Sequence, residues 1–193
     1  MNTPNLIKTS PEAKCAQPAG ILETFDDPEL VKMVNAVLKW VGDACPGQPH
    51  YWLTLSGKSD IGKTRCAKHA WNRLQRCGFT STIRSNYDPA FIYWPRFVAD
   101  LRVNEEARQI AIDTARWPIL ILDDIGSERD TTGFAAEQLM VILGAREGRH
   151  TLLTTNLTID QLVAIDARLA SRIMRGGNRF MQINTTTYYE RTH

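Results

Sequence analysis

The sequence has no apolar run long enough to cross a membrane, and its first residues lack the apolar segment of a signal peptide. Cysteine is scarce, and no two cysteines form a Cys-x-x-Cys pair. The cysteines are Cys15, Cys45, Cys66 and Cys77. Such wide spacing argues against a disulfide-stapled secreted domain and against a cysteine metal site. We therefore expect a soluble protein with reduced thiols in a reducing compartment.

The chain also lacks a strong excess of either charge. Its 23 lysines and arginines nearly balance 21 aspartates and glutamates, giving a formal net charge of +2. Any contact with nucleic acid must therefore come from local basic clusters rather than from the chain as a whole. One cluster is spaced as a single helix face and consists of Arg168, Arg172 and Arg175, with Arg179 just beyond.

Internal repeats and low-complexity tracts are absent too, and 193 residues suit one α/β domain. A hydrophobic content of 43% is enough for an ordinary core. Residues 1–20 are polar, contain several prolines and show no sustained periodicity, so we expect a flexible N-terminal arm there. Residues 21–193 are predicted to form the folded domain.

Strands alternate with helices along that domain, which predicts a parallel sheet covered on both faces. Asp27 followed by Pro28 predicts the start of the first helix, and Gly42 its end. Five strands are expected, at residues 51–55, 81–85, 118–122, 151–155 and 179–183. Later helices are expected at residues 64–77, at 89–116 with a break at Trp94-Pro95, at 133–146, and after a capping box at Thr158.

The most informative motif lies between the first strand and the helix that follows it. It fits G-x-x-x-x-G-K-[ST], in which glycines let backbone N–H groups converge on phosphates at the start of a helix. Lys63 is expected to lie in a solvated loop and to reach the β- and γ-phosphates, and Thr64 to bind Mg²⁺. The alternative is a glycine-containing turn with a solvated lysine. The predicted nucleotide-binding residues are Gly57, Lys58, Ser59, Asp60, Ile61, Gly62, Lys63, Thr64 and Arg65.

Further polar residues follow the third and fourth strands, at the edge where open α/β sheets bind ligands. Asp123 is predicted to hold Mg²⁺, and Asp124 to orient and deprotonate an attacking water. The amide of Asn156 can hydrogen-bond the γ-phosphate or that water. Alternatively, the two acids could cap the next segment, and Asn156 could be a turn residue.

Arg172 is the last candidate, because a guanidinium stabilises charge on a transferring phosphoryl group and a neighbouring subunit can supply it. The alternative is a solvated arginine on an exposed helix face. The predicted catalytic residues are thus Asp124, Asn156 and Arg172, and the predicted metal ligands are Thr64 and Asp123.

Taken in order, these segments resemble the AAA+ ATPases of the DnaC/IstB-like branch, which includes helicase loaders and helper ATPases of insertion sequences. The matching segments are residues 57–64, 119–126, 154–157 and 168–173, and the resemblance spans residues 22–189. It implies a P-loop NTPase fold with an AAA+ core, and ATP and Mg²⁺ as cofactors. It also implies Walker B acids at Asp123 and Asp124, a sensor-1 residue at Asn156, an arginine finger at Arg172, and adenine near residues 22–27.

The sequence departs from that family's pattern in several places. Asp60 brings a carboxylate near the phosphates, where the family often has small residues. Asp124 is one methylene shorter than the more common glutamate, which suggests slow hydrolysis. Too few residues follow Arg172 for a full C-terminal lid domain, so no sensor-2 residue is assigned. Only residues 1–20 are available to dock a helicase, since the loaders' N-terminal helicase-binding domain is missing.

We predict an ATP-hydrolysing DNA-replication accessory protein resembling a helicase loader, in the cytoplasm of a bacterium or a phage-infected cell. Its expected partners are a replicative helicase or another replication or transposition protein, single-stranded DNA, and further copies of itself when ATP is bound. The alternatives are a transposition helper ATPase and a nucleotide-gated adaptor with little hydrolysis. A nucleotide or nucleoside kinase would share the phosphate loop, but no basic lid segment is found.

DNA contact is expected from Arg96, Arg102, Arg168 and Arg175. Three aromatic residues, Tyr93, Trp94 and Phe97, could stack on unpaired bases, although we expect at least two of them to pack in the core.

Overall fold

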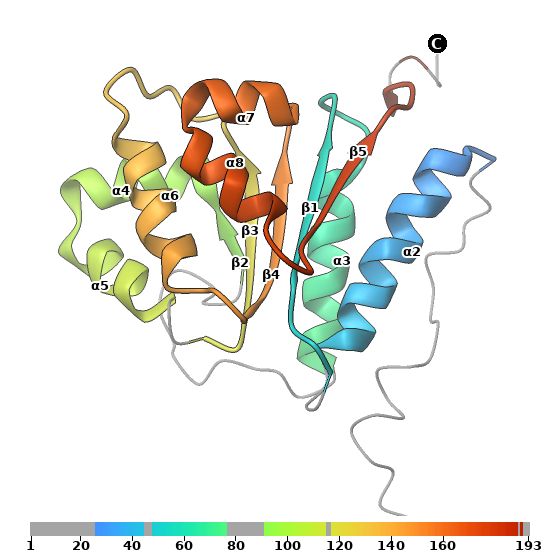
Figure 1. The fold of residues 1–193 in the computed structure, drawn as a ribbon, viewed down its shortest axis with the longest axis horizontal. Coiled ribbons are helices and arrows are strands. Elements are labelled where there is room, and N and C mark those ends of the chain that lie inside the picture. The colour runs from blue at the N-terminus through green and yellow to red at the C-terminus, as the bar shows by residue number, and fades with distance from the viewer. Residues whose placement is uncertain (1–25, 45–47, 77–90, 115–116, 189, 191–193) are drawn as a thin grey trace, which may run out of the picture.

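A five-stranded parallel sheet with helices on both faces organises the protein (Figure 1), as the sequence predicts. The structure is a computed structural model that describes residues 26–44, 48–76, 91–114, 117–188 and 190. The strands are β1 (Trp52–Gly57), β2 (Phe91–Tyr93), β3 (Ile119–Ile125), β4 (His150–Thr155) and β5 (Arg179–Ile183). The helices are α2 (Pro28–Asp43), α3 (Lys63–Arg76), α4 (Trp94–Val103), α5 (Glu105–Thr114), α6 (Phe134–Gly144), α7 (Ile159–Ile165) and α8 (Ala167–Met174). Within these residues, no helix is both long and apolar enough to span a membrane.

The strand order, β2-β3-β4-β1-β5, places β1 between the central strand β4 and the edge strand β5. β1 pairs with β4 on one side, where Ser56 lies opposite Thr155, and with β5 on the other. β3 pairs with β4 in turn. All these strands are parallel, so the segments that follow β1, β3 and β4 emerge side by side at one edge of the sheet.

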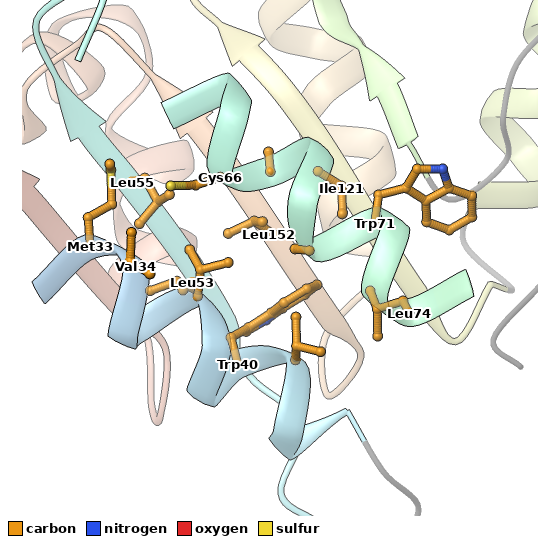
Figure 2. Packing of buried hydrophobic residues seen from close by; sticks show 14 of the residues in the cluster. Met33, Val34, Trp40, Leu53, Leu55, Cys66, Trp71, Leu74, Ile121 and Leu152 are labelled. Atoms are coloured by element: carbon orange, nitrogen blue, oxygen red, sulfur yellow. The ribbon is translucent and has the colours of Figure 1, made fainter. Parts of the chain in front are cut away.

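Alternate residues of the buried strands point into two separate cores, because the side-chain period of a strand is two. Leu53 and Leu55 face α2 and α3, whose Trp40 and Leu74 close that core (Figure 2). The intervening residues of each buried strand, such as Leu120 of β3, point the other way and face the second core under α4 to α8. The continuous apolar run at the start of β3 therefore fills both cores, as expected of a buried parallel strand.

The first helix begins as its sequence indicates. The Asp27 side chain accepts hydrogen bonds from the backbone N–H of Glu29 at 2.8 Å and of Leu30 at 3.4 Å, and Pro28 occupies the first turn. These contacts satisfy N–H groups that a helix start leaves without intrahelical partners. The predicted capping box at Thr158 is also present, with Gln161 as its partner.

An arginine side chain is fully buried at the opposite end of β4. The Arg146 guanidinium donates to the backbone oxygens of Thr114 (2.5 Å), Trp117 (2.9 Å) and His150 (2.9 Å), and to the Thr151 hydroxyl (3.0 Å). It therefore ties the end of α5 and the start of β3 to the start of β4. No carboxylate among the described residues pairs with it, so carbonyl and hydroxyl oxygens provide its stabilisation.

Two expectations about the segment 89–116 are wrong. Residues Phe91–Tyr93 form strand β2, paired with β3, instead of a helix. The predicted break at Trp94-Pro95 is instead the first turn of α4, where proline lacks only a donor that a helix start does not use. Trp94 and Phe97 are fully buried, as expected for two of the three aromatic residues, whereas Tyr93 is exposed. The expected arm at 1–20, the expected strand at 81–85 and Cys15, Cys45 and Cys77 lie outside the described residues.

Candidate nucleotide-binding site

The edge where β1, β3 and β4 end borders a cleft of about 1100 Å³. The phosphate loop lines its floor, with Asp124 and Asn156 at one end. The first turns of α2 form an apolar wall, and the chain after β5 contributes two further lining residues. The lining residues of α2 are Leu30, Met33 and Val34, and those after β5 are Thr186 and Tyr188. The cleft thus combines polar groups, suited to phosphates, with a few apolar side chains.

Glycine is required at the start of the phosphate loop. Gly57 has φ 154°, and a Cβ atom there would lie 2.7 Å from the backbone oxygen of Ile183. Gly62, just before α3, has φ 99°. The exposed Asp60 lies between them with φ 62°, a left-handed conformation that aspartate tolerates better than most residues. The loop is therefore shaped by its glycines and directs its backbone into the cleft.

Lys63 is buried, which corrects the expectation of a solvated side chain. Its exposed fraction is 6%, and its ammonium donates to the backbone oxygens of Gly57 (2.8 Å) and Lys58 (2.6 Å) and to Asn156 Oδ1 (2.8 Å). Burial lowers the pKa of Lys63 to about 8, although the nearby Asp124 and Asp123 act to raise it. Lys63 therefore links the start of the phosphate loop to Asn156.

Asp123 is buried between two threonine hydroxyls. Its Oδ1 accepts hydrogen bonds from Thr64 Oγ1 at 3.1 Å and from Thr154 Oγ1 at 2.7 Å. Its Oδ2 is buried and finds no hydrogen-bond partner among the described residues. Burial raises the pKa of Asp123, while the Thr154 and Thr64 hydroxyls oppose that shift. A buried carboxylate oxygen beside a hydroxyl fits Mg²⁺, which takes one or two protein oxygens together with phosphates and water.

A bulge in β3 brings the second acid to the same edge. Leu122 pairs with Leu153 but Ile125 pairs with Thr155, so β3 contains one extra residue at this point. Asp124 has φ 67°, and its backbone N–H donates to Thr154 Oγ1 at 2.8 Å. Without the bulge, two consecutive side chains would point to opposite faces of the sheet.

The carboxylate of Asp124 is held on both of its oxygens. Asn156 Nδ2 donates to Oδ1 at 3.2 Å, and Ser127 Oγ and the Tyr93 hydroxyl donate to Oδ2 at 2.7 Å and 3.4 Å. Asn156 uses its oxygen for Lys63 and its amide N–H for Asp124. It therefore joins the phosphate loop to the second acid of β3.

The structure places Arg172 outside this cleft. It lies on α8 and lines a separate hollow of about 400 Å³ together with Arg168 and Arg175. Arg172 Nη1 donates to Glu147 Oε1 at 3.2 Å, and Arg175 Nη1 contacts the same oxygen at 3.0 Å. The Arg172 side chain is 29% exposed, so it is neither buried nor fully solvated.

Several residues of the site were not predicted from the sequence to be functional, among them Ser127, Thr154, Thr186 and Tyr188. Thr154 had a usable signal, since it lies two residues before the predicted site residue Asn156, on the strand that pairs with β3. Ser127 and Tyr188 had none, because their positions depend on how loops return to the sheet edge. Tyr93 was considered only for base stacking, and its contact with Asp124 was not predicted.

Solved structures share this architecture. A crystal structure of DnaI has a TM-score of 0.67 and 21% identity, covering 91% of this chain and 92% of that one. The DnaC helicase loader has a TM-score of 0.64 and 20% identity, with 84% and 95% covered. This chain has the AAA+ fold of those proteins. The replication initiator DnaA bound to AMPPCP and single-stranded DNA has a TM-score of 0.58 and 15% identity, covering 78% of this chain and 46% of that one. No family model and no curated protein matches the sequence.

Proposed function

We propose that this AAA+ protein is a Mg²⁺-dependent ATPase that acts in DNA replication in the manner of a helicase loader. The observation that carries the proposal is the connection of Lys63 through Asn156 to Asp124, beside the Thr64–Asp123 pair. This places a phosphate-binding cation, a carboxylate base and a metal-binding pair at one end of a single cleft.

Lys63 moves from its loop carbonyls to the β- and γ-phosphates when ATP enters. Its three present acceptors are all oxygens, and phosphate oxygens replace them at lower cost because they carry more charge. Backbone N–H groups at the start of α3 complete the phosphate cradle. The ammonium thus changes partners without being exposed to bulk water.

Thr64 and Asp123 would hold Mg²⁺, which neutralises charge on the phosphates. Thr154 keeps Asp123 Oδ1 pointed toward Thr64. The Asp123 carboxyl is buried and its pKa is raised, so a nearby divalent cation would favour its ionised form.

Asp124 acts as the base that takes a proton from the attacking water, and Asn156 contacts that water or the γ-phosphate. One feature favours slow turnover: Asn156, Ser127 and Tyr93 already donate to the Asp124 oxygens. A water can use this base only by replacing one of these donors. The same feature favours a second candidate function, a nucleotide-gated adaptor that binds ATP and hydrolyses little of it.

Partners are proposed from the structural neighbours, one of which is a helicase loader and another an initiator bound to single-stranded DNA. Candidate DNA contacts are Arg96, Arg102, Arg168 and Arg175. Each has a carboxylate within 4 Å, namely Asp100 (3.7 Å), Asp130 (2.8 Å), Asp166 (2.8 Å) and Glu147 (3.0 Å), respectively. DNA phosphates must compete with these carboxylates. Because each phosphate contact releases a counterion from the DNA, binding should weaken steeply with salt, by about 0.7 log units per log unit for each phosphate contacted.

The test compares ATP binding and turnover of the parent protein and of Lys63→Ala, with and without single-stranded DNA. Lys63→Ala should lose ATP binding, and Arg73→Ala, on the same helix outside the cleft, should keep it. Turnover that rises with single-stranded DNA supports the loader. ATP binding with no turnover under either condition supports the adaptor. Equal ATP affinity in Lys63→Ala and the parent would overturn both.

A further inference from the structure

The chain that follows β5 returns to the nucleotide cleft. This segment, residues 184–188, is here called the β5 extension. Figure 1 shows it leaving the sheet between the loop after β1 and the start of α2. Two of its residues, Thr186 and Tyr188, line the cleft opposite the apolar residues of α2.

Two hydrogen bonds fix the β5 extension in this position. The Tyr188 backbone N–H donates to the backbone oxygen of Asp60 in the phosphate loop at 2.9 Å. The Thr185 hydroxyl donates to Asp27 Oδ2 at the start of α2. Asp27 uses its other oxygen, Oδ1, to cap α2, so the two roles do not compete. The β5 extension is thus attached to both walls of the cleft.

The side chains at this end of the cleft suit a flat aromatic ligand. Leu30, Met33 and Val34 line the cleft beside Asp26 and Asp27. Each of these three apolar residues is only 2–4% exposed. Tyr188 lines the cleft and is 62% exposed, so its ring is accessible to a ligand. Stacking of a nucleobase would cover this ring, and such stacking tolerates different bases because every base has a π-face.

We propose that the β5 extension forms one wall of the base pocket, with Tyr188 stacking on the nucleobase and Thr185 positioning it. This inference rests on the proposed function, since it assumes a nucleoside triphosphate whose phosphates occupy the loop of Lys63. It adds a base-binding residue to the site.

The test separates base binding from phosphate binding by calorimetry, with Mg²⁺-ATP and Mg²⁺-tripolyphosphate as the probes. Tyr188→Ala should weaken ATP about tenfold and leave tripolyphosphate unchanged, because the latter has no base. Tyr188→Phe keeps the ring and should stay within about twofold of the parent. Thr185→Val should also weaken ATP alone, and Thr185→Ser, which keeps the hydroxyl, should restore it.

A second readout uses the triphosphate of 2-aminopurine riboside at saturation. Stacking on Tyr188 should quench its fluorescence, and Tyr188→Ala should relieve that quenching. ATP affinity and quenching unchanged in Tyr188→Ala would overturn the inference, as would an equal loss of ATP and tripolyphosphate. A parent protein that binds no ATP would instead overturn the proposed function, and the inference with it. ATP binding by the parent that is lost in Lys63→Ala but not in Tyr188→Ala would refute the inference alone.

Discussion

The Lys63 ammonium lies 2.8 Å from Asn156 Oδ1, so a residue of the phosphate loop contacts the residue that follows β4. The amide N–H of the same asparagine contacts Asp124. A ligand that binds Lys63 in place of Asn156 would therefore free the side-chain oxygen of Asn156. The side-chain N–H of Asn156 would still contact the proposed base, Asp124. Phosphate occupancy and base orientation are linked through this one side chain.

Asp124→Asn should retain ATP binding and lower turnover by about a hundredfold or more, since an amide cannot accept the proton of the water. Asp123→Asn should instead weaken Mg²⁺-dependent ATP binding, because it removes the proposed metal ligand. Titrations with and without Mg²⁺, together with turnover rates, distinguish the two. If Asp124→Asn lost Mg²⁺-dependent binding and Asp123→Asn did not, the two roles would have to be exchanged.

ATP affinity should fall as the pH rises through about 8, the lowered pKa of Lys63. The protonated lysine is the form that binds phosphate, and bound phosphate raises the pKa of Lys63. The affinity for ATP is therefore highest below the pKa that Lys63 has in the free protein, and it declines above that pKa. The dissociation constant should increase about tenfold between pH 7 and pH 9. Lys63→Arg is the control, because its guanidinium stays charged throughout and should flatten the profile. A parent profile as flat as that of Lys63→Arg would show that protonation of Lys63 does not limit binding.

Arg172 should act on the nucleotide of a neighbouring copy, since within its own chain it lies on α8 outside the cleft. Arg172→Ala should bind ATP normally and turn it over about a hundredfold more slowly. Arg175→Ala, which removes the other arginine on Glu147, should keep turnover in assays without DNA.

Mixing provides the decisive measurement for Arg172. Combined Arg172→Ala and Lys63→Ala proteins should recover part of the activity, because an intact nucleotide site in one copy can meet an intact Arg172 from the other. No recovery at any ratio, in preparations shown to contain mixed oligomers, would assign Arg172 to the surface contact with Glu147 alone.

Arg146→Met should lower the free energy of unfolding by about 3 kcal/mol. The variant fills similar space but leaves buried oxygens at Thr114, Trp117 and His150 without this donor. Urea unfolding measures the effect, and the exposed Arg129→Ala, expected within about 0.5 kcal/mol of the parent, is the control. An equally small effect for both would mean that other groups can satisfy those oxygens.

Local signals in the sequence predicted a large part of the fold. Asp27-Pro28 located the start of α2, and the apolar run from Ile119 to Leu122 identified a strand buried on both faces. β2 was missed because three residues at a sheet edge give too short a pattern beside a long helical one. Its strand character depends on pairing with β3, which no local pattern records.

The candidate site, too, was predicted only in part from the sequence. The phosphate loop and the acids near the end of β3 follow from residue types at fixed spacing, and the structure brings them together. The hydrogen bonds that hold these residues in place join positions far apart in the sequence: Lys63 with Asn156, Tyr93 with Asp124, and Tyr188 with Asp60. They depend on the order of strands in the sheet and on loop paths, neither of which has a periodic signature.

The extra residue in β3 would affect any attempt to graft this site onto another protein. Grafting the Asp123-Asp124 pair onto a regular parallel strand would turn one carboxylate toward the opposite core, because strand side chains alternate. A donor segment must therefore carry the irregular backbone as well as the two acids, together with an equivalent of Thr154 to support it. Deleting one residue between Leu122 and Ile125 would straighten the strand and leave a single acid at this edge of the sheet. The backbone bulge and its acidic side chains therefore have to be transferred together.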